Sequence, residues 1–224
     1  MHPTWLVIAK APRSGFVKTR LCPPCTPEQA AQIAEAALRD TIDAVDLAQA
    51  ERRVLVLDGE TPTWLAEDWE VRPQSGDGLD QRLAAAFASE SGPTLLVGMD
   101  TPQLTPAHLD EAASQLVDYD AVIGPAFDGG FWLVGMREPD PGVFPGVPMS
   151  VTDTGRLQRQ RLHERFDAVA DTVMLADFDT WPDALAIAEG IPDTRFGVAI
   201  RRARGALPPG VPADGCDEGA APTP

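Results

Sequence analysis

Positive charge is scarce in this sequence of 224 residues. Its 18 Lys and Arg stand against 34 Asp and Glu, and the formal net charge is −16. Such a field repels polyanions, which excludes nucleic acid and anionic membrane surfaces as general partners. A small phosphorylated ligand is not excluded, because only the potential inside its own pocket matters.

Long hydrophobic runs and cysteine are also scarce. No apolar stretch approaches the roughly 20 residues that span a bilayer, and the N-terminus enters an apolar strand without a signal-peptide pattern; we therefore expect a cytoplasmic protein without a membrane span. Three cysteines are too few for a disulfide framework. Cys22-Pro-Pro-Cys25 has the spacing of a redox or metal pair, but no second pair or nearby His accompanies it, and we interpret it as an ordinary turn.

Apolar, β-branched runs alternate with helical patterns along the chain. Strands are expected at Trp5–Ala9, Val54–Leu57, Thr94–Met99, Ala121–Gly124, Phe131–Gly135 and Val173–Leu175, with a weaker one at Glu70–Arg72. Helices are expected at about 26–50, 79–89, 105–119, 152–166, 182–189 and 193–204. This alternation predicts an α/β fold with a mostly parallel central sheet, helices on both faces and ligands at the carboxyl ends of the strands.

A change of composition near the C-terminus sets the expected domain boundary. From Gly205 onward proline, glycine and alanine dominate and aromatic residues vanish. We expect a single domain over residues 1–204 and a disordered tail over residues 205–224.

The only two lysines, Lys10 and Lys18, lie in one loop after the first apolar run. This segment carries four cations and no acid, and reads Lys10-Ala11-Pro12-Arg13-Ser14-Gly15-Phe16-Val17-Lys18-Thr19-Arg20. Lysine is a compact point charge suited to phosphate, and a glycine lets the backbone approach a ligand closely. The loop lacks the Walker A and dinucleotide glycine patterns. A solvated basic loop is the plainer alternative, but the absence of acids favours a phosphate site.

Two aspartates follow apolar runs and are candidate metal ligands. Asp100 closes Thr94–Met99, and Asp179 follows Val173–Leu175. Carboxylates at the carboxyl ends of parallel strands lie where ligands bind, and hard oxygen ligands suit Mg²⁺ or Mn²⁺. The alternative for Asp100 is a turn or cap aspartate, and capping explains the neighbouring Thr180 and Asp183.

Two glycine-containing segments complete the set of candidates. Asp128-Gly129-Gly130 lies between two apolar runs; it is either a plain hairpin turn or a place where an acceptor binds beside Asp128. Gln74, Gly76, Asp77 and Arg82 join a glycine-rich loop to a helix start, a ready anion or nucleotide site. A simple loop is the alternative there.

Taken in order, these segments resemble the bacterial DUF2064 proteins, a type 1 transferase family in the GT-A nucleotide-diphospho-sugar transferase superfamily. The similarity covers roughly residues 4–190. It rests on Ala9-Lys10-Ala-Pro-x-x-Gly15-x-Val-Lys18-Thr19-Arg20-Leu21, Gly76-Asp77-Gly78-Leu79-x-x-Arg82, Gly98-x-Asp100-x-Pro102, Gly124-Pro125-Ala126-x-Asp128-Gly129-Gly130-Phe131 and Asp177-x-Asp179-Thr180.

The resemblance implies a GT-A fold, a Rossmann-like αβα sandwich that binds a nucleotide or nucleotide sugar with Mg²⁺ or Mn²⁺. It implies that the Lys10–Arg20 loop holds phosphates, that Asp100 is the metal or ribose aspartate and that Asp179 is a second metal ligand. With the residue patterns above, the expected nucleotide-binding residues are Lys10, Ala11, Pro12, Gly15, Lys18, Arg20, Gln74, Gly76, Asp77, Arg82, Gly129 and Gly130. We expect Asp100 and Asp179 to hold the metal, and Lys18, Asp100 and Asp128 to act in catalysis. The sequence departs from the family pattern after Asp179, where Thr-Trp-Pro-Asp replaces Thr-x-Glu-Asp, and the glycosyltransferase D-x-D is absent because Gly98-Met-Asp100 holds one aspartate.

Three functions remain open at this stage. The leading hypothesis is metal-dependent transfer of a glycosyl group from a nucleotide sugar to a small acceptor. The second is nucleotidyl transfer from a nucleoside triphosphate to a phosphorylated small molecule, with release of pyrophosphate. The single aspartate at Asp100 somewhat favours this second reaction. The third is a non-catalytic nucleotide-binding protein. The base, the sugar, the acceptor and the oligomeric state are not specified by the sequence.

Overall fold

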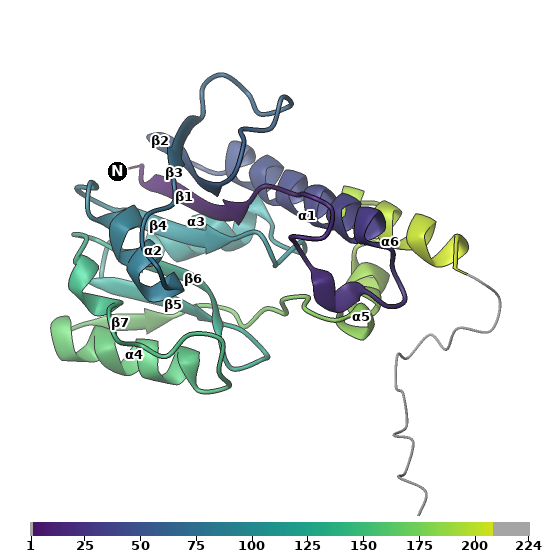
Figure 1. Ribbon diagram of the computed structural model, residues 1–224. Coiled ribbons are helices and arrows are strands. Elements are labelled where there is room, and N and C mark those ends of the chain that lie inside the picture. The colour runs from purple at the N-terminus through teal and green to yellow at the C-terminus, as the bar shows by residue number, and fades with distance from the viewer. Residues whose placement is uncertain (1, 208–224) are drawn as a thin grey trace, which may run out of the picture.

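The computed structural model describes residues 2–207. The strands are β1 (Thr4–Lys10), β2 (Arg52–Asp58), β3 (Glu70–Pro73), β4 (Thr94–Gly98), β5 (Ala121–Pro125), β6 (Phe131–Met136) and β7 (Val169–Asp171). The helices are α1 (Pro27–Leu47), α2 (Leu79–Phe87), α3 (Pro106–Gln115), α4 (Thr154–Arg165), α5 (Trp181–Gly190) and α6 (Arg195–Gly205), with 3₁₀ turns η1 (Thr19–Leu21) and η2 (Pro141–Val143). Figure 1 shows these elements as helices around one central sheet.

The strands of the described residues form one sheet in the order β3-β2-β1-β4-β6-β5-β7. All neighbouring pairs are parallel except β6, which is antiparallel to both β4 and β5. The carboxyl ends of β1, β2, β4 and β5 therefore share one edge with the amino end of β6. The predicted α/β fold with a mostly parallel sheet is confirmed.

Alternating residues of β1 show how the sheet separates two cores. Trp5, Val7 and Ala9 belong to the cluster that includes α1 and α3 residues. Leu6 and Ile8 point to the opposite face, into the cluster that includes residues of α2, η2 and α4. Successive side chains of a strand point to opposite faces, so β1 contributes to both cores and has to be apolar along its length.

A third apolar cluster joins α1, α5 and α6 beside the sheet, where Figure 1 shows the three helices together. Its largest fully buried side chains include Trp181, Phe178 and Phe196, and the rings of the two phenylalanines lie 4.7 Å apart. Leu21, at the end of η1, packs into the same cluster. The segment after β1 and the segment before α5 are thus anchored to a common core.

Helix starts follow the expected capping chemistry. Thr26 caps α1 in a capping box with Gln29, and Thr180 caps α5 in a capping box with Asp183. Thr105 accepts a hydrogen bond from the backbone of His108 at the start of α3. These threonines satisfy N–H groups that have no partner within the helix.

One predicted strand is wrong. The last strand is β7 (Val169–Asp171), four residues before the predicted Val173–Leu175. Val173 and Met174 are exposed, and Leu175 makes only an isolated bridge to Ala126. The apolar run Val173–Leu175 was misleading, because the strand that pairs with β5 at this edge of the sheet is the shorter and less apolar segment Val169–Asp171.

The C-terminal prediction is only partly covered by the described residues. Helix α6 extends to Gly205, whereas residues 208–224 of the predicted disordered tail lie outside the described residues. The expected single domain over residues 1–204 stays a prediction. Within residues 2–207, no helix is long and apolar enough to cross a membrane.

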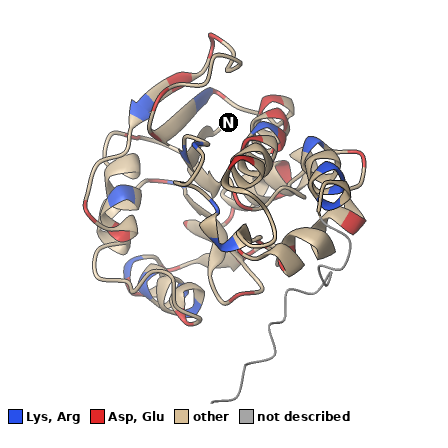
Figure 2. Ribbon diagram, turned by 45° about the vertical axis from the view of Figure 1, so that its right-hand side comes forward, with Lys and Arg blue, Asp and Glu red and all other residues tan. Residues whose placement is uncertain are grey.

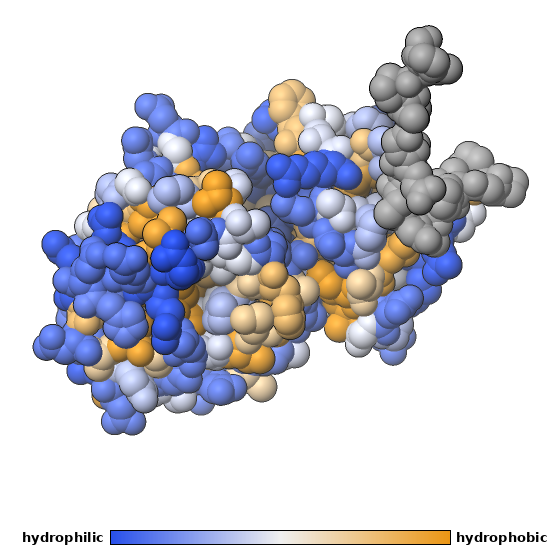
Figure 3. Space-filling view, turned by 90° about the horizontal axis from the view of Figure 1, so that it is seen from below, coloured by the Kyte–Doolittle hydropathy of each residue, from blue (hydrophilic) through white to orange (hydrophobic). Residues whose placement is uncertain are grey.

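The surface carries charges of both signs, as Figure 2 shows. The four arginines of α4 pair with acids, through the contacts Arg156–Asp153, Arg159–Asp171, Arg161–Glu164 and Arg165–Asp140. In the view of Figure 3, hydrophobic residues form separate patches among hydrophilic ones. The α4 arginines therefore form a solvated, ion-paired face and not a site.

Candidate active site

A cleft of about 880 Å³ opens at the edge of the sheet where β1, β4 and β5 end. Ten of the predicted site residues line it: Lys10, Lys18, Arg20, Gln74, Asp77, Arg82, Asp100, Asp128, Gly130 and Asp179. Five others do not: Ala11, Pro12, Gly15, Gly76 and Gly129. Segments far apart in the sequence thus meet in one cavity.

The ammonium group of Lys18 is the centre of this arrangement. Its Nζ lies 2.9 Å from Asp100 Oδ1 and 3.1 Å from Asp179 Oδ1. It also donates to the carbonyl oxygen of Phe178 and lies 4.1 Å from the centre of that ring. The Lys18 side chain is only 9% exposed. Its charge is therefore directed at two carboxylates, whereas the sequence predicted that it would face a phosphate.

The backbone of the first loop is shaped to place this side chain. Lys18 has a left-handed conformation with φ 48° and ψ 38°, which is uncommon for a residue other than glycine. Such strain persists where the surroundings hold it, and it concentrates at functional sites. Ala11 serves the loop in another way, because it packs against Gly59, where a Cβ would lie 2.5 Å from its own.

Arg20 and Lys10 provide the more accessible positive charge. Arg20 Nη1 lies 3.0 Å from Asp179 Oδ2, and its side chain is 73% exposed. Lys10 ends β1 and is exposed at the cleft. Both cations can meet an anion entering from solvent without leaving a buried position.

Gln74 holds the ends of two strands together. Its Nε2 donates to the carbonyl oxygens of Ala9, at 2.7 Å, and Val56, at 3.2 Å. Its Oε1 accepts from Arg82, which also donates to the carbonyl oxygen of Gly76. Gln74 therefore supports the wall of the cleft, while the guanidinium of Arg82 adds a half-buried positive charge.

The loop between β5 and β6 was expected to be either a hairpin turn or a place where an acceptor binds, and the structure has features of both. Asp128 Oδ1 accepts a hydrogen bond from the Gly130 amide at 2.7 Å, as in a turn between antiparallel strands. Asp128 nevertheless lines the cleft. Gly129 has φ 91°, and a Cβ there would lie 1.9 Å from the carbonyl oxygen of Thr152. That glycine is required by packing against the segment before α4, so it does not open space for a ligand.

Asp177 is a cleft residue that the sequence reasoning did not select. Burial, and after it the negative charge of Asp128, raise the pKa of Asp177 to about 6. The signal was present in the sequence as the alternation Asp177-x-Asp179, which places a second carboxylate on the same segment. Ser150, at φ 61°, is a further strained residue that lines the cleft.

The residues present fit a divalent cation by the chemistry of their donor atoms. Asp100 and Asp179 offer carboxylate oxygens, which Mg²⁺ and Mn²⁺ prefer, and the ammonium of Lys18 shows that both can converge on one cation. Within residues 2–207, no three His, Cys, Asp or Glu side chains are grouped to hold a metal. Water and substrate phosphate would have to supply the remaining ligands, as is usual for Mg²⁺.

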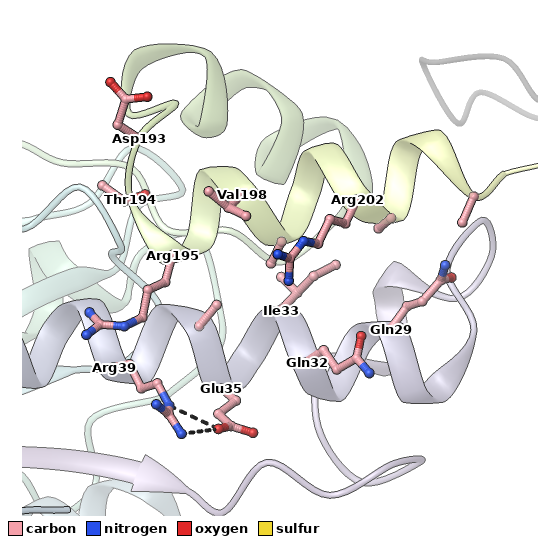
Figure 4. A pocket seen from close by; sticks show the side chains of 14 residues that line it. Gln29, Gln32, Ile33, Glu35, Arg39, Asp193, Thr194, Arg195, Val198 and Arg202 are labelled. Carbon is pink, nitrogen blue, oxygen red and sulfur yellow. Dashed lines mark hydrogen bonds and ion pairs between the residues drawn. The ribbon is translucent and has the colours of Figure 1, made fainter. Parts of the chain in front are cut away.

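A second cavity, of about 650 Å³, lies between α1 and α6 (Figure 4). Ile33, Val198 and Arg202 line it, and none of the predicted site residues does. The Arg39 side chain shown there pairs with Glu35 at 2.9 Å. The cleft at the sheet edge, where chemically active residues converge, is the candidate active site.

A family profile described as "Uncharacterized protein conserved in bacteria (DUF2064)" matches residues 32–151, more than half of the chain. The chain belongs to the DUF2064 family. The resemblance drawn from the motifs is thus confirmed. Among curated proteins, none matches the sequence of this DUF2064 protein.

Solved structures share the fold of the DUF2064 protein. A putative nucleotide-diphospho-sugar transferase from Desulfovibrio desulfuricans G20 aligns with TM-score 0.81 and 24% identity, over 92% of this chain and 96% of that one. Rv0371c of Mycobacterium tuberculosis H37Rv, solved in complex with manganese, aligns with TM-score 0.53 and 20% identity, over 84% and 100%. The 4-diphosphocytidyl-2C-methyl-D-erythritol synthase of Anaerococcus prevotii aligns with TM-score 0.54 and 12% identity, over 84% and 98%. The predicted GT-A-type fold is confirmed.

Proposed function

We propose that this protein is a metal-dependent transferase that moves a glycosyl group from a nucleotide sugar to a small hydroxylated acceptor. The observation that carries the proposal is the convergence of the basic first loop with Asp100 and Asp179 in one cleft. Lys10, Arg20 and Arg82 line the same cleft and supply positive charge for a diphosphate. The similar fold of a nucleotide-diphospho-sugar transferase supports this assignment.

The divalent cation would be held by Asp100 and Asp179. When bound, Mg²⁺ or Mn²⁺ supplies charge neutralisation to the diphosphate leaving group. Arg20 contributes fixed positive charge beside Asp179, and fixed charge that needs no rearrangement during the reaction favours the transition state.

Asp128 is placed to act on the acceptor. Its Oδ1 is engaged by the Gly130 amide, which leaves Oδ2 to accept the proton of an acceptor hydroxyl. The hydroxyl oxygen then forms a bond to the anomeric carbon of the sugar. The bond from that carbon to the diphosphate breaks, and the nucleoside diphosphate leaves with the electron pair.

The charges around Asp128 favour a neutral acceptor. This side of the cleft is lined by the β5–β6 loop, the segment before α4, and Asp177. The charges that act on Asp177 are those of the acids Asp128 and Asp179 and, in the opposite direction, that of Lys18, so acids are in excess there. A phosphorylated acceptor would be repelled there, whereas the half-buried Phe131 offers apolar surface to the carbon face of a sugar or polyol.

Nucleotidyl transfer is the second candidate. A nucleotidyl transferase from Methanothermobacter shares the fold with TM-score 0.51 and 16% identity, and the Anaerococcus enzyme is by its name the synthase of a diphosphocytidyl compound. The same cations and carboxylates would then act on the α-phosphate of a nucleoside triphosphate, and pyrophosphate would leave. The third candidate, a non-catalytic nucleotide-binding protein, predicts binding without turnover.

Identification of the leaving group tests these alternatives. The protein is incubated with Mn²⁺, a panel of nucleotide sugars and nucleoside triphosphates, and neutral and phosphorylated small acceptors, and ³¹P NMR follows the products. We expect a nucleoside diphosphate from a nucleotide sugar, and its loss in Asp100→Asn but not in Asp118→Asn, a change on the exposed turn after α3. Pyrophosphate would favour the second candidate, and nucleotide binding without any product would favour the third.

A further inference from the structure

Lys18 occupies the place that a cation would take between Asp100 and Asp179. Its Nζ lies 2.9 Å from Asp100 Oδ1 as an ion pair, and it donates hydrogen bonds to Asp179 Oδ1 and to the carbonyl oxygen of Phe178. Three oxygens, two from carboxylates and one from the backbone, thus lie around the ammonium group. The amide of Phe178 donates in turn to the carbonyl oxygen of Asp100 at 3.1 Å, which ties the two segments together.

These oxygens cannot hold both cations at once. Mg²⁺ requires its oxygen ligands at about 2.0–2.1 Å, whereas the ammonium nitrogen lies 2.9 and 3.1 Å from the two carboxylates. A metal ion among the same oxygens would lie almost on top of the ammonium and would repel it. The two carboxylates would also have to close in; their side chains are 45% and 49% exposed, and Asp179 would do so while its Oδ2 is paired with Arg20.

We infer that Lys18 and a divalent cation bind alternately to the oxygens of Asp100, Asp179 and Phe178. The metal site is therefore blocked until the phosphates of a substrate draw the ammonium away. This second step rests on the proposed function, since it requires a nucleotide diphosphate in the cleft. The carbonyl of Phe178 thereby becomes a third candidate ligand beside the two predicted aspartates.

The first loop has the features that such an exchange needs. The Lys18 side chain has a flexible four-carbon stem, so its ammonium group can move while the backbone of the loop stays in place. Lys10 and Arg20 lie in the same cleft and attract the diphosphate first, because both are exposed.

Alternate occupation couples two ligands. If a diphosphate removes Lys18 from the carboxylates, it raises the affinity for metal, and the metal must raise the affinity for the diphosphate by the same factor. A protein built in this way binds the metal mainly together with its substrate.

Titration of free Mn²⁺ by electron paramagnetic resonance tests the exchange without an activity assay. The full chain is titrated without nucleotide as wild type, Lys18→Met and Arg13→Met. Arg13→Met is the matched control, because it removes an exposed cation of the same loop that does not line the cleft. We expect Lys18→Met to bind Mn²⁺ about tenfold more tightly than wild type, Arg13→Met to bind like wild type, and the gain to vanish in Lys18→Met combined with Asp100→Asn.

A measurement on the wild type alone gives a second readout should Lys18→Met fold poorly. UDP, ADP, GDP and CDP are tested in turn, and the one that binds should raise the Mn²⁺ affinity of the protein by about tenfold beyond the Mn²⁺ that the nucleotide binds by itself. Equal Mn²⁺ affinities of wild type and Lys18→Met, or a gain that survives Asp100→Asn, would overturn the inference. If none of the four nucleotides binds, the proposed function fails; equal affinities with a bound nucleotide defeat only the inference.

Discussion

The electrostatic environment of Asp177 can be tested by measuring how the stability of the protein depends on pH. Burial, followed by the charge of Asp128, raises the pKa of Asp177 from 3.8 to about 6. The folded protein therefore holds the proton of this carboxyl more tightly than the unfolded chain does. Replacement by Asn removes a charge that the folded state accommodates poorly, so we expect Asp177→Asn to be more stable than wild type at pH 8.

The sign and size follow from proton linkage. Between pH 3.8 and 6 the folded state binds more protons at this site than the unfolded state, so the stability contributed by the site falls as the pH rises through that window and is constant above it. One pKa unit corresponds to about 1.4 kcal/mol. The shift of about two units gives a cost of about 3 kcal/mol at pH 8, which solvent in the open cleft reduces to about 1–3 kcal/mol.

Urea denaturation at a series of pH values, with EDTA present, measures this cost. The free energy of unfolding of Asp177→Asn minus that of wild type should rise from near zero at pH 4 to about 1–3 kcal/mol at pH 8. Asp118→Asn, which removes an exposed charge, should show no such rise. A difference that is flat across the pH range, or a variant less stable than wild type at pH 8, would refute the electrostatic account of Asp177.

Three further substitutions test the packing around the site and the fold, each by thermal or urea denaturation. Gly129→Ala should destabilise the folded protein by about 3 kcal/mol or more, because its Cβ would meet the carbonyl oxygen of Thr152 at 1.9 Å. Gly92→Ala is the control: its φ is also positive, but no atom lies within 4 Å of the added Cβ, so it should cost only about 1 kcal/mol. Glu90→Gln should cost about 3 kcal/mol, because this carboxylate, 1% exposed, balances two arginine side chains. Thr26→Ala should cost about 1 kcal/mol by removing the cap of α1, and a loss near zero would contradict the capping role.

Local chemistry explains why most of the fold was predictable. Thr26-Pro27 and Thr105-Pro106 predict helix starts. The threonine hydroxyl accepts from an N–H group that the helix leaves free, and proline fits the first turn because it has no N–H to leave unpaired. The strands around Val7 and Leu55 are apolar on both faces because each is buried in the sheet. An apolar run does not predict a strand reliably at the edge of the sheet. There, Val173 is exposed and β7 forms four residues before it.

The position of β6 in the sheet is a feature that the sequence pattern could not predict. The Asp128-Gly129 dipeptide allowed a hairpin, and β5 and β6 do pair antiparallel across it. Periodicity alone could not show that β6 would be inserted between β4 and β5, since pairing order depends on which strand edges are free in space. This insertion brings Asp128 to the same edge of the sheet as Asp100.

The sequence predicted several of the residues that line the cleft, but it did not predict which of them contact one another. The rule that carboxyl ends of parallel strands meet at one edge led to Lys18 and Asp100 as neighbours in one site, whereas Asp179 was placed there through the predicted strand Val173–Leu175, which does not form. It did not say whether the lysine would face solvent or the two acids, because that depends on the left-handed backbone at residue 18 and on the position of Phe178. The same local detail affects the chemistry: a lysine turned outward could contact a phosphate at once, whereas one held by two carboxylates must first leave them.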